Sequence, residues 1–128
     1  MDIDPIVVSF DLTPAGRPMF AVYPTLDKVP WGTSPTLVWT LKAGPNASAA
    51  LFHPEIGIRF VPSRRYPAVW PNAQPAPVPT SAGLQYSAED PNNKPGAETT
   101  IYKYNVTVMI DGKTYTWDPE EENEGEGA

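Results

Sequence analysis

His53 is the side chain in this sequence best suited to general acid–base catalysis, because an imidazole titrates closest to neutral pH. It is the only histidine, and Glu55 follows two residues later, so the pair could form a base and its orienting carboxylate. A catalytic triad also requires a nucleophile, and a metal site usually requires several converging ligands. No Gly-x-Ser-x-Gly, His-Glu-x-x-His, P-loop or dinucleotide-binding motif occurs in the chain. We therefore predict that the protein is not an enzyme and that His53 is a loop residue.

Carboxylates are the other side chains that could carry chemistry, and the chain has fifteen of them. A suitably spaced pair can hydrolyse a glycosidic bond. Any fold with this many acids offers such pairs, so their number singles out no site. The chain has no cysteine, which excludes disulfides, thiolate catalysis, zinc–thiolate sites and iron–sulfur clusters. We expect neither a metal site nor a cofactor.

The segment from 61 to 80, "VPSRRYPAVWPNAQPAPVPT", is the best candidate for a binding surface. It contains Arg64, Arg65, Tyr66 and Trp70 among six prolines, and its second half favours extended polyproline II geometry. Arginine and aromatic side chains are typical interface anchors, and proline keeps them rigid at low entropic cost. A second reading is a sugar platform in which Tyr66 or Trp70 stacks on a pyranose. A third is an ordered loop that crosses from one sheet to the other, with Tyr66 and Trp70 plugging the end of the sandwich.

Trp31 lies in the turn-rich stretch "KVPWGTSP" and completes the candidate binding surface. It either covers the core or stands exposed at a rim together with Trp70, and the second arrangement predicts a binding edge. Two functions follow: a non-catalytic structural or protein-interaction module, with a protein partner or a homo-oligomer, and a carbohydrate-binding module that uses Trp31, Tyr66 and Trp70. The arginines suit carboxylates, either on a partner or on the acidic end of this chain.

The net charge of −6 comes from the end of the chain. All nine bases precede residue 118, so residues 1–117 carry nine charges of each sign, and the six remaining acids follow: Asp118, Glu120, Glu121, Glu122, Glu124 and Glu126. A stretch so charged and so poor in apolar groups is typical of disorder. We predict one β-sandwich domain over 1–117 and a disordered acidic tail over 118–128. A neutral body does not favour nucleic-acid binding.

The N-terminal stretch "MDIDPIVVSF" has acids and a proline where a secretory signal has bases. No apolar run approaches the roughly 18 residues that a membrane-spanning helix needs. We expect a cytoplasmic protein that does not bind membranes.

Seventeen prolines decide the fold class, because a helix interior accepts proline only at a cost of about 3 kcal/mol. Alternation of apolar and polar residues predicts about seven strands instead. The expected strands cover 5–12, 18–24, 36–42, 55–61, 84–87, 106–110 and 113–117, with only a short helical turn near Asn46. Their inward positions include Ile6, Val8, Phe10 and Leu12 in the first, Leu37, Trp39 and Leu41 in the third, and Ile56, Ile58 and Phe60 in the fourth. An all-β fold with these strands indicates a two-sheet sandwich or a barrel, and at this length we prefer a single antiparallel two-sheet β-sandwich.

The last two strands form the best-defined element. Asp111 and Gly112 are the pair that a type I′ hairpin turn prefers, since both positions need positive φ. With these turn residues, Val108 faces Tyr115 and Val106 faces Trp117, which places the large side chains of both strands on one face.

The strand "TLVWTL" with its inward Trp39, and the final hairpin with Tyr102, Tyr104 and Trp117, resemble the cysteine-free immunoglobulin-like and fibronectin-like modules of bacterial proteins. The resemblance implies an immunoglobulin-like sandwich. It implies no particular function, because such folds carry many.

Overall fold

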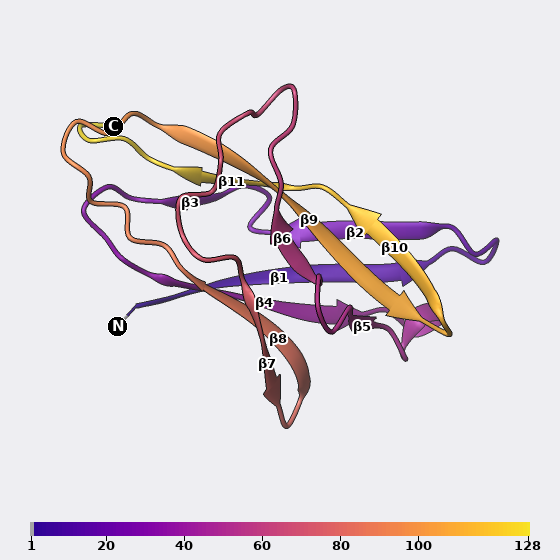
Figure 1. The fold of residues 1–128 in the computed structure, drawn as a ribbon. Coiled ribbons are helices and arrows are strands. Elements are labelled where there is room, and N and C mark those ends of the chain that lie inside the picture. The colour runs from indigo at the N-terminus through magenta and orange to yellow at the C-terminus, as the bar shows by residue number, and fades with distance from the viewer. Residues whose placement is uncertain (1) are drawn as a thin grey trace.

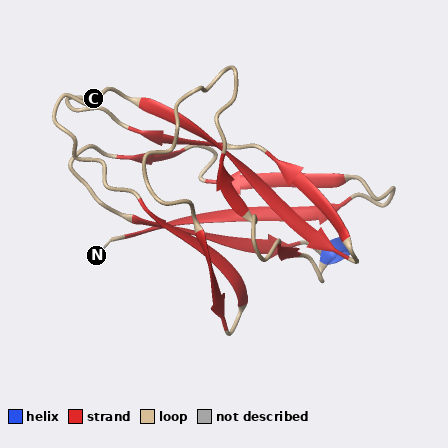
Figure 2. Ribbon diagram, viewed as in Figure 1, coloured by secondary structure: helices blue, strands red, loops and turns tan. Residues whose placement is uncertain are grey.

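Eleven strands and one turn of 3₁₀ helix make up the described part of the chain, residues 2–128 of the computed structural model (Figures 1 and 2). The prediction of an all-β fold with two packed sheets is confirmed. Seven of these strands correspond to the seven expected ones. The total is higher because four further short strands pair into the two sheets. The additional strands are β3 (Asp27–Val29), β5 (Leu51–Phe52), β7 (Ala76–Thr80) and β11 (Glu120–Asn123).

The first sheet has five strands in the order β2-β1-β4-β8-β7. Besides β7, it contains β1 (Ile3–Leu12), β2 (Pro18–Tyr23), β4 (Thr36–Ala43) and β8 (Gly83–Glu89). Strand β7 is at the edge, which is where a strand with Pro77 and Pro79 can be accommodated, since the missing N–H groups leave no neighbour unpaired.

The second sheet is built around β9 (Thr100–Ile110). One side of β9 pairs with β10 (Lys113–Trp117) and then with β11, and β3 pairs with β11. Strands β5 and β6 (Ile58–Phe60) also pair with β9. The 3₁₀ turn, Pro45–Ala47, precedes β5.

Both sheets are mixed, so the prediction of a purely antiparallel sandwich is wrong. Strand β1 pairs in parallel with β4, and β11 pairs in parallel with β3. Alternation within a strand reports only which residues face the core, and it is the same for parallel and antiparallel neighbours. The pairing direction therefore had no signal in the sequence.

The C-terminal hairpin has the register that the sequence predicts. Tyr115 pairs with Val108 and Trp117 with Val106, and both turn residues, Asp111 and Gly112, have positive φ of 50° and 77°. Both positive values fit the turn proposed for this Asp-Gly pair.

The same ladder continues beyond Trp117 into β11, so the prediction of a disordered tail is wrong for Glu120–Asn123. Glu120 pairs with Lys103 and Asn123 with Thr100 without a change of register, and the Tyr104 N–H donates to the Pro119 carbonyl oxygen between the two strands. Backbone pairing with β9 on one side and β3 on the other offsets the unfavourable composition of this stretch. The sandwich therefore includes residues placed in the tail by composition.

The core lies between the sheets and is mostly aromatic and β-branched. The fully buried Trp39 packs edge-on against Phe60 and Tyr104, and the inward positions of β1 and of β9 complete the cluster. Of the three predicted inward residues in 55–61, Ile58 and Phe60 are buried, but Ile56 is 43% exposed because it precedes the strand. In the described residues, no helix is long and apolar enough to cross a membrane.

Candidate functional site

The predicted binding segment forms a loop that crosses from β6 in the second sheet to β7 in the first. Its projecting part, residues 63–69, is called the arginine loop below. A local turn orders it, because the Ser63 N–H donates to the Tyr66 carbonyl oxygen and the Tyr66 N–H donates to the Ser63 hydroxyl, both at 3.0 Å. Arg64 and Arg65 are exposed, Tyr66 is half-buried, and the Arg65 guanidinium lies 5.3 Å from the centre of the Tyr66 ring.

Trp70 is not part of an exposed surface. Its ring is 6% exposed and stacks on Phe60 with centroids 3.8 Å apart and planes 4° apart, and Tyr102 packs edge-on against it. The indole N–H donates to the Ala73 carbonyl oxygen at 3.1 Å. An apolar ring gains more from this contact than from solvent. Trp70 therefore closes the sandwich where the chain crosses between the sheets.

Trp31 lies elsewhere. It is half-buried, and its indole N–H donates to the Lys94 carbonyl oxygen at 2.9 Å, which ties it to the loop between β8 and β9. The predicted rim with Trp31 and Trp70 side by side and exposed does not form, because Trp70 is buried.

His53 makes local hydrogen bonds to its own turn. Its Nδ1 accepts hydrogen bonds from the backbone N–H groups of Glu55 and Ile56, at 3.1 and 3.2 Å. These bonds hold the turn that leads to β6.

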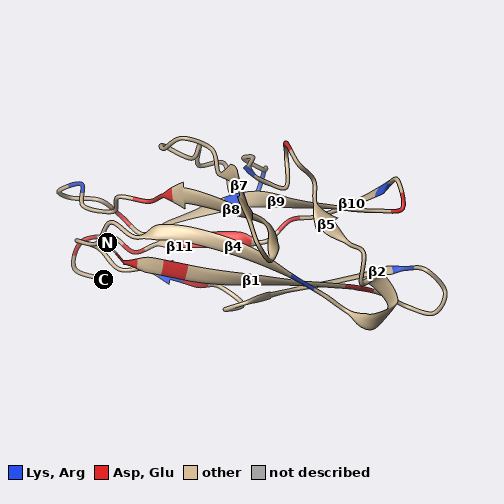
Figure 3. Cartoon of the chain, turned by 90° about the horizontal axis from the view of Figure 1, so that it is seen from below, with Lys and Arg blue, Asp and Glu red and all other residues tan. Residues whose placement is uncertain are grey.

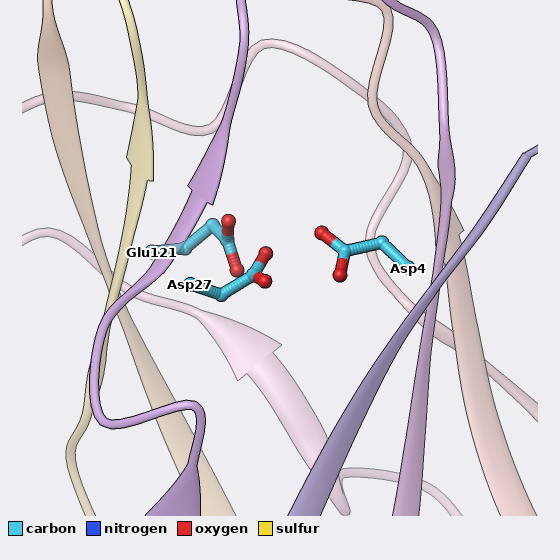
Figure 4. Close-up of side chains that lie close together, drawn as sticks. All are labelled: Asp4, Asp27 and Glu121. Atoms are coloured by element: carbon cyan, nitrogen blue, oxygen red, sulfur yellow. The ribbon is translucent and has the colours of Figure 1, made fainter.

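A second cluster, which the sequence analysis missed, consists of Asp4, Asp27 and Glu121 and is called the carboxylate cluster below. Asp4 comes from β1 in the first sheet, and Asp27 and Glu121 come from β3 and β11 in the second. One carboxylate oxygen from each lies within 4.8 Å of the others. Figure 4 shows the carboxyl groups of Asp27 and Glu121 together and Asp4 pointing toward them from the opposite side. The two chain ends lie at this end of the sandwich (Figures 1 and 3).

The three strands place these acids at positions that would normally be apolar. Asp4 is two residues before the buried Ile6 and shares its face of β1. Glu121 continues the inward positions of β10 and β11, on which Tyr115, Trp117 and Pro119 precede it. Glu121 is 0% exposed and Asp27 is 6% exposed, while Asp4 is half-buried and leaves one side of the cluster closer to solvent.

The buried oxygens of the carboxylate cluster have no hydrogen-bond donor from outside the cluster. Both carboxylate oxygens of Glu121 and Oδ2 of Asp27 are buried without a partner. The only ion pair within residues 2–128 joins Lys103 to Asp118 at 2.8 Å, so no basic side chain offsets the cluster's charge. A buried carboxylate without a donor or a counter-charge is costly. A shared proton or a bound cation can satisfy such oxygens.

A further buried acid, Asp90, lies beside the cluster in a layer of asparagines. Its Oδ1 accepts from the Asn123 side chain at 2.8 Å and from that of Asn72 at 3.4 Å. Asn92 donates its side-chain N–H groups to the carbonyl oxygens of Val29 and Glu124, at 3.0 and 2.9 Å. A cavity of about 400 Å³ opens against this layer and is lined in part by Asn72, Asn92 and Asn123.

Burial is the main cause of the raised pKa values of Asp4, Asp90 and Glu121. Desolvation, with a hydrogen bond and charge from Asp27 and charge from Asp90, raises the pKa of Asp4 to about 8. Desolvation, with Asp27 next, raises the pKa of Glu121 to about 12. Desolvation also raises the pKa of Asp90 to about 6, against the lowering effect of its bond from Asn123. The carboxyls can share protons or bind a cation, but an external substrate cannot reach the fully buried Glu121.

The sequence contained a signal for this cluster. Asp4 is in phase with Ile6, Val8 and Phe10, and Glu121 is in phase with Tyr115 and Trp117, so each acid continues an apolar face. Composition predicted disorder for the tail, whereas the two-residue period marks Glu121 as an inward position. Asp27 carried no such signal, because β3 is only three residues long.

The chain matches no protein-family model, and no curated protein sequence matches it at a significant level.

Proposed function

We propose that this protein is a non-catalytic structural or protein-interaction module of the immunoglobulin-like type, and that the arginine loop contacts an acidic partner protein. One observation carries the proposal: the loop is rigid at its base and open at its tip. Trp70 fixes the base inside the sandwich, while Arg64 and Arg65 are exposed and Val69 is 73% exposed. The support for the immunoglobulin-like assignment is the fully buried Trp39 between two sheets.

A loop ordered before binding loses little conformational freedom when a partner docks. The Ser63–Tyr66 turn and Trp70 provide this order. Arginine forms planar, two-point contacts with carboxylates, and its stacking on Tyr66 limits the freedom of the Arg65 side chain. The chemistry of the tip thus favours a carboxylate-bearing protein surface with an apolar residue that can meet Val69.

The loop also has a neighbouring surface on which a partner can rest. Arg65, Tyr66, Pro67 and Ala68 form one wall of a shallow depression, and residues 99–101 at the start of β9 form the other. Interfaces gain most from aromatic and arginine anchors placed beside such depressions.

The acidic end of this chain is a poor occupant for the arginine loop. Residues 120–123 are paired on both sides, and Glu126 accepts a hydrogen bond from the Gly96 N–H at 2.8 Å. The carboxylates that the arginines would meet are accordingly those of another molecule.

Charge reversal tests the proposal. The variant Arg64→Glu/Arg65→Glu is compared with Lys42→Glu/Lys113→Glu, which makes the same charge change at two other exposed positions. Photo-crosslinking from position 69 in cells, followed by mass spectrometry, identifies the partner. The proposal predicts a crosslinked protein that is lost in the arginine variant and kept in the lysine variant. Equal crosslinking in both variants contradicts it.

The carbohydrate alternative has less support. A pyranose needs a free aromatic face. Trp70 is buried against Phe60, the Arg65 guanidinium lies over the Tyr66 ring, and Trp31 is half-buried with its indole N–H bonded to the Lys94 carbonyl oxygen. A cytoplasmic location, no binding to nucleic acid and no binding to membranes complete the proposal. The support for these points is the balanced charge over residues 1–117.

A further inference from the structure

We propose that Asp4, Asp27 and Glu121 bind a divalent cation, Ca²⁺, between the two sheets of the sandwich. The site is separate from the arginine loop, and its role is to hold the ends of the chain together. Two independent observations support it: three carboxylate oxygens from three strands converge within 4.8 Å, and both oxygens of the most deeply buried of these side chains, Glu121, have no donor from outside the cluster.

The carboxylate cluster presents only oxygen atoms, which can act as ligands to a cation. Glu121 and Asp27 are direct neighbours across the parallel pairing of β11 and β3, and both side chains point into the interior (Figure 4). Asp4 faces them from β1 in the other sheet. No basic side chain forms an ion pair with Asp4, Asp27 or Glu121, so the negative charge of the cluster is not balanced by the protein. A cation supplies the missing positive charge and satisfies several oxygens at once.

The donor set selects the cation. All three side chains are carboxylates, and the single histidine, His53, is held by its own turn near β6. Zinc and copper prefer nitrogen and sulfur ligands, whereas calcium and magnesium prefer oxygen. Two oxygens on opposite sides of Ca²⁺ lie about 4.6–5.2 Å apart, twice the Ca–O distance, and about 4.0–4.2 Å apart around Mg²⁺. Oxygens within 4.8 Å of one another are compatible with Ca²⁺, which tolerates irregular coordination, whereas Mg²⁺ demands a near-ideal octahedron.

The surroundings can complete the coordination. Calcium takes six to eight oxygens, and three carboxylates supply three to six of them. Asp4 is half-buried, so water can reach the open side of the site and the ion has a path inward. Asp90 adds a further negative charge nearby, and Asn123 and Asn72 hold it in place.

The test uses the full chain, freed of metal with a chelator and returned to chelator-free buffer at pH 7.5. Isothermal titration with CaCl₂ and, separately, with MgCl₂ measures affinity and stoichiometry, and thermal unfolding measures stabilisation. We expect one Ca²⁺ per chain and a midpoint raised by roughly 5 °C or more at saturating Ca²⁺. Magnesium should have a smaller effect.

Matched variants separate the site from general charge effects. Glu121→Gln removes one ligand, and Glu122→Gln removes the same charge from the next, outward position of β11. We expect at least a tenfold loss of Ca²⁺ affinity in Glu121→Gln and no change in Glu122→Gln. Asp4→Asn, at the half-buried ligand, provides a second test if Glu121→Gln does not fold.

Two results would overturn the proposal. The first is no binding heat and no shift of the unfolding midpoint at about 5 mM Ca²⁺, which means that the carboxyls share protons only. The second is an equal response to Ca²⁺ in the wild type, Glu121→Gln and Asp4→Asn. Both measurements use the isolated chain, so they are independent of any partner of the arginine loop.

Discussion

Glu121 and Asp27 are paired neighbours on β11 and β3, and both point their carboxyl groups into the interior of the sandwich. Neighbouring carboxylates repel one another strongly in a medium of low dielectric constant. The pair is stable only when protons or a cation reduce this repulsion. Stability, ionisation and ion binding are therefore linked in this protein.

The first prediction concerns pH in the absence of divalent cations. The pKa of Asp90 is raised to about 6, that of Asp4 to about 8 and that of Glu121 to about 12, so the folded chain keeps protons that the unfolded chain releases above about pH 4. The stabilising contribution is complete below that pH and is lost as the pH rises through the folded values. Urea unfolding in a chelator at pH 5, 6.5 and 8 should show a falling free energy of unfolding.

The expected decline is on the order of 1 kcal/mol per pH unit for each carboxyl that stays protonated in the folded state. Glu122→Gln serves as the control and should keep the slope. A free energy of unfolding that rises from pH 5 to pH 8 contradicts the assignment of these groups.

The second prediction concerns Trp70. Trp70→Ala removes a buried ring that stacks on Phe60, so it should cost about 3–5 kcal/mol of unfolding free energy. Val69→Ala alters the adjacent, exposed residue and should change stability by less than about 0.5 kcal/mol. Chemical denaturation followed by circular dichroism compares the two. Similar stabilities would show that Trp70 does not close the sandwich.

The third prediction concerns Asn92, which is 7% exposed and donates to the carbonyl oxygens of Val29 and Glu124. Asn92→Ala leaves two carbonyl oxygens without this donor, and we expect a loss of about 1–3 kcal/mol. Asn93 is the exposed neighbour, so Asn93→Ala is a matched control and should be close to neutral. Thermal unfolding of both variants at equal concentration decides the matter. Equal losses of stability in Asn92→Ala and Asn93→Ala would show that the loss comes from any change in this loop and not from the two hydrogen bonds of Asn92.

The fourth prediction concerns the end of the chain. Truncation after Trp117 removes β11, which leaves the edges of β3 and β9 without their partner. We expect a protein that unfolds at much lower temperature or aggregates through the open edges. Truncation after Gly125 keeps β11 and serves as the control. A stable, monomeric chain ending at Trp117 would return residues 118–128 to the role of a disordered tail.

The alternation of side chains explains which parts of the fold could be predicted. Val106, Val108, Tyr115 and Trp117 report both a face and a register, because a slip of one residue would move all of them to the other side. The pairing of β1 with β4 could not be predicted, since Ile6 and Trp39 show burial but not strand direction.

The residues of the candidate sites also differ in how far local sequence could predict their positions. Arg64 and Arg65 are exposed, as a local run of polar residues suggests, whereas the burial of Trp70 depends on Phe60 and Tyr102 from separate strands. The carboxylate cluster brings together residues 4, 27 and 121, and no local pattern reports that these three meet. Only the phase of Asp4 and of Glu121 with their apolar neighbours indicated that both point inward.

The carboxylate cluster joins Asp4 to Glu121, residues that are 117 positions apart (121 − 4). Contacts between such distant segments require the largest loop closure, so they tend to form late in folding. An interaction that is absent from the transition state slows unfolding and leaves the folding rate nearly unchanged. A cation bound by this cluster should therefore act chiefly on the lifetime of the folded chain. It must dissociate from Asp4 or Glu121 before their two strands can separate, so it lowers the unfolding rate.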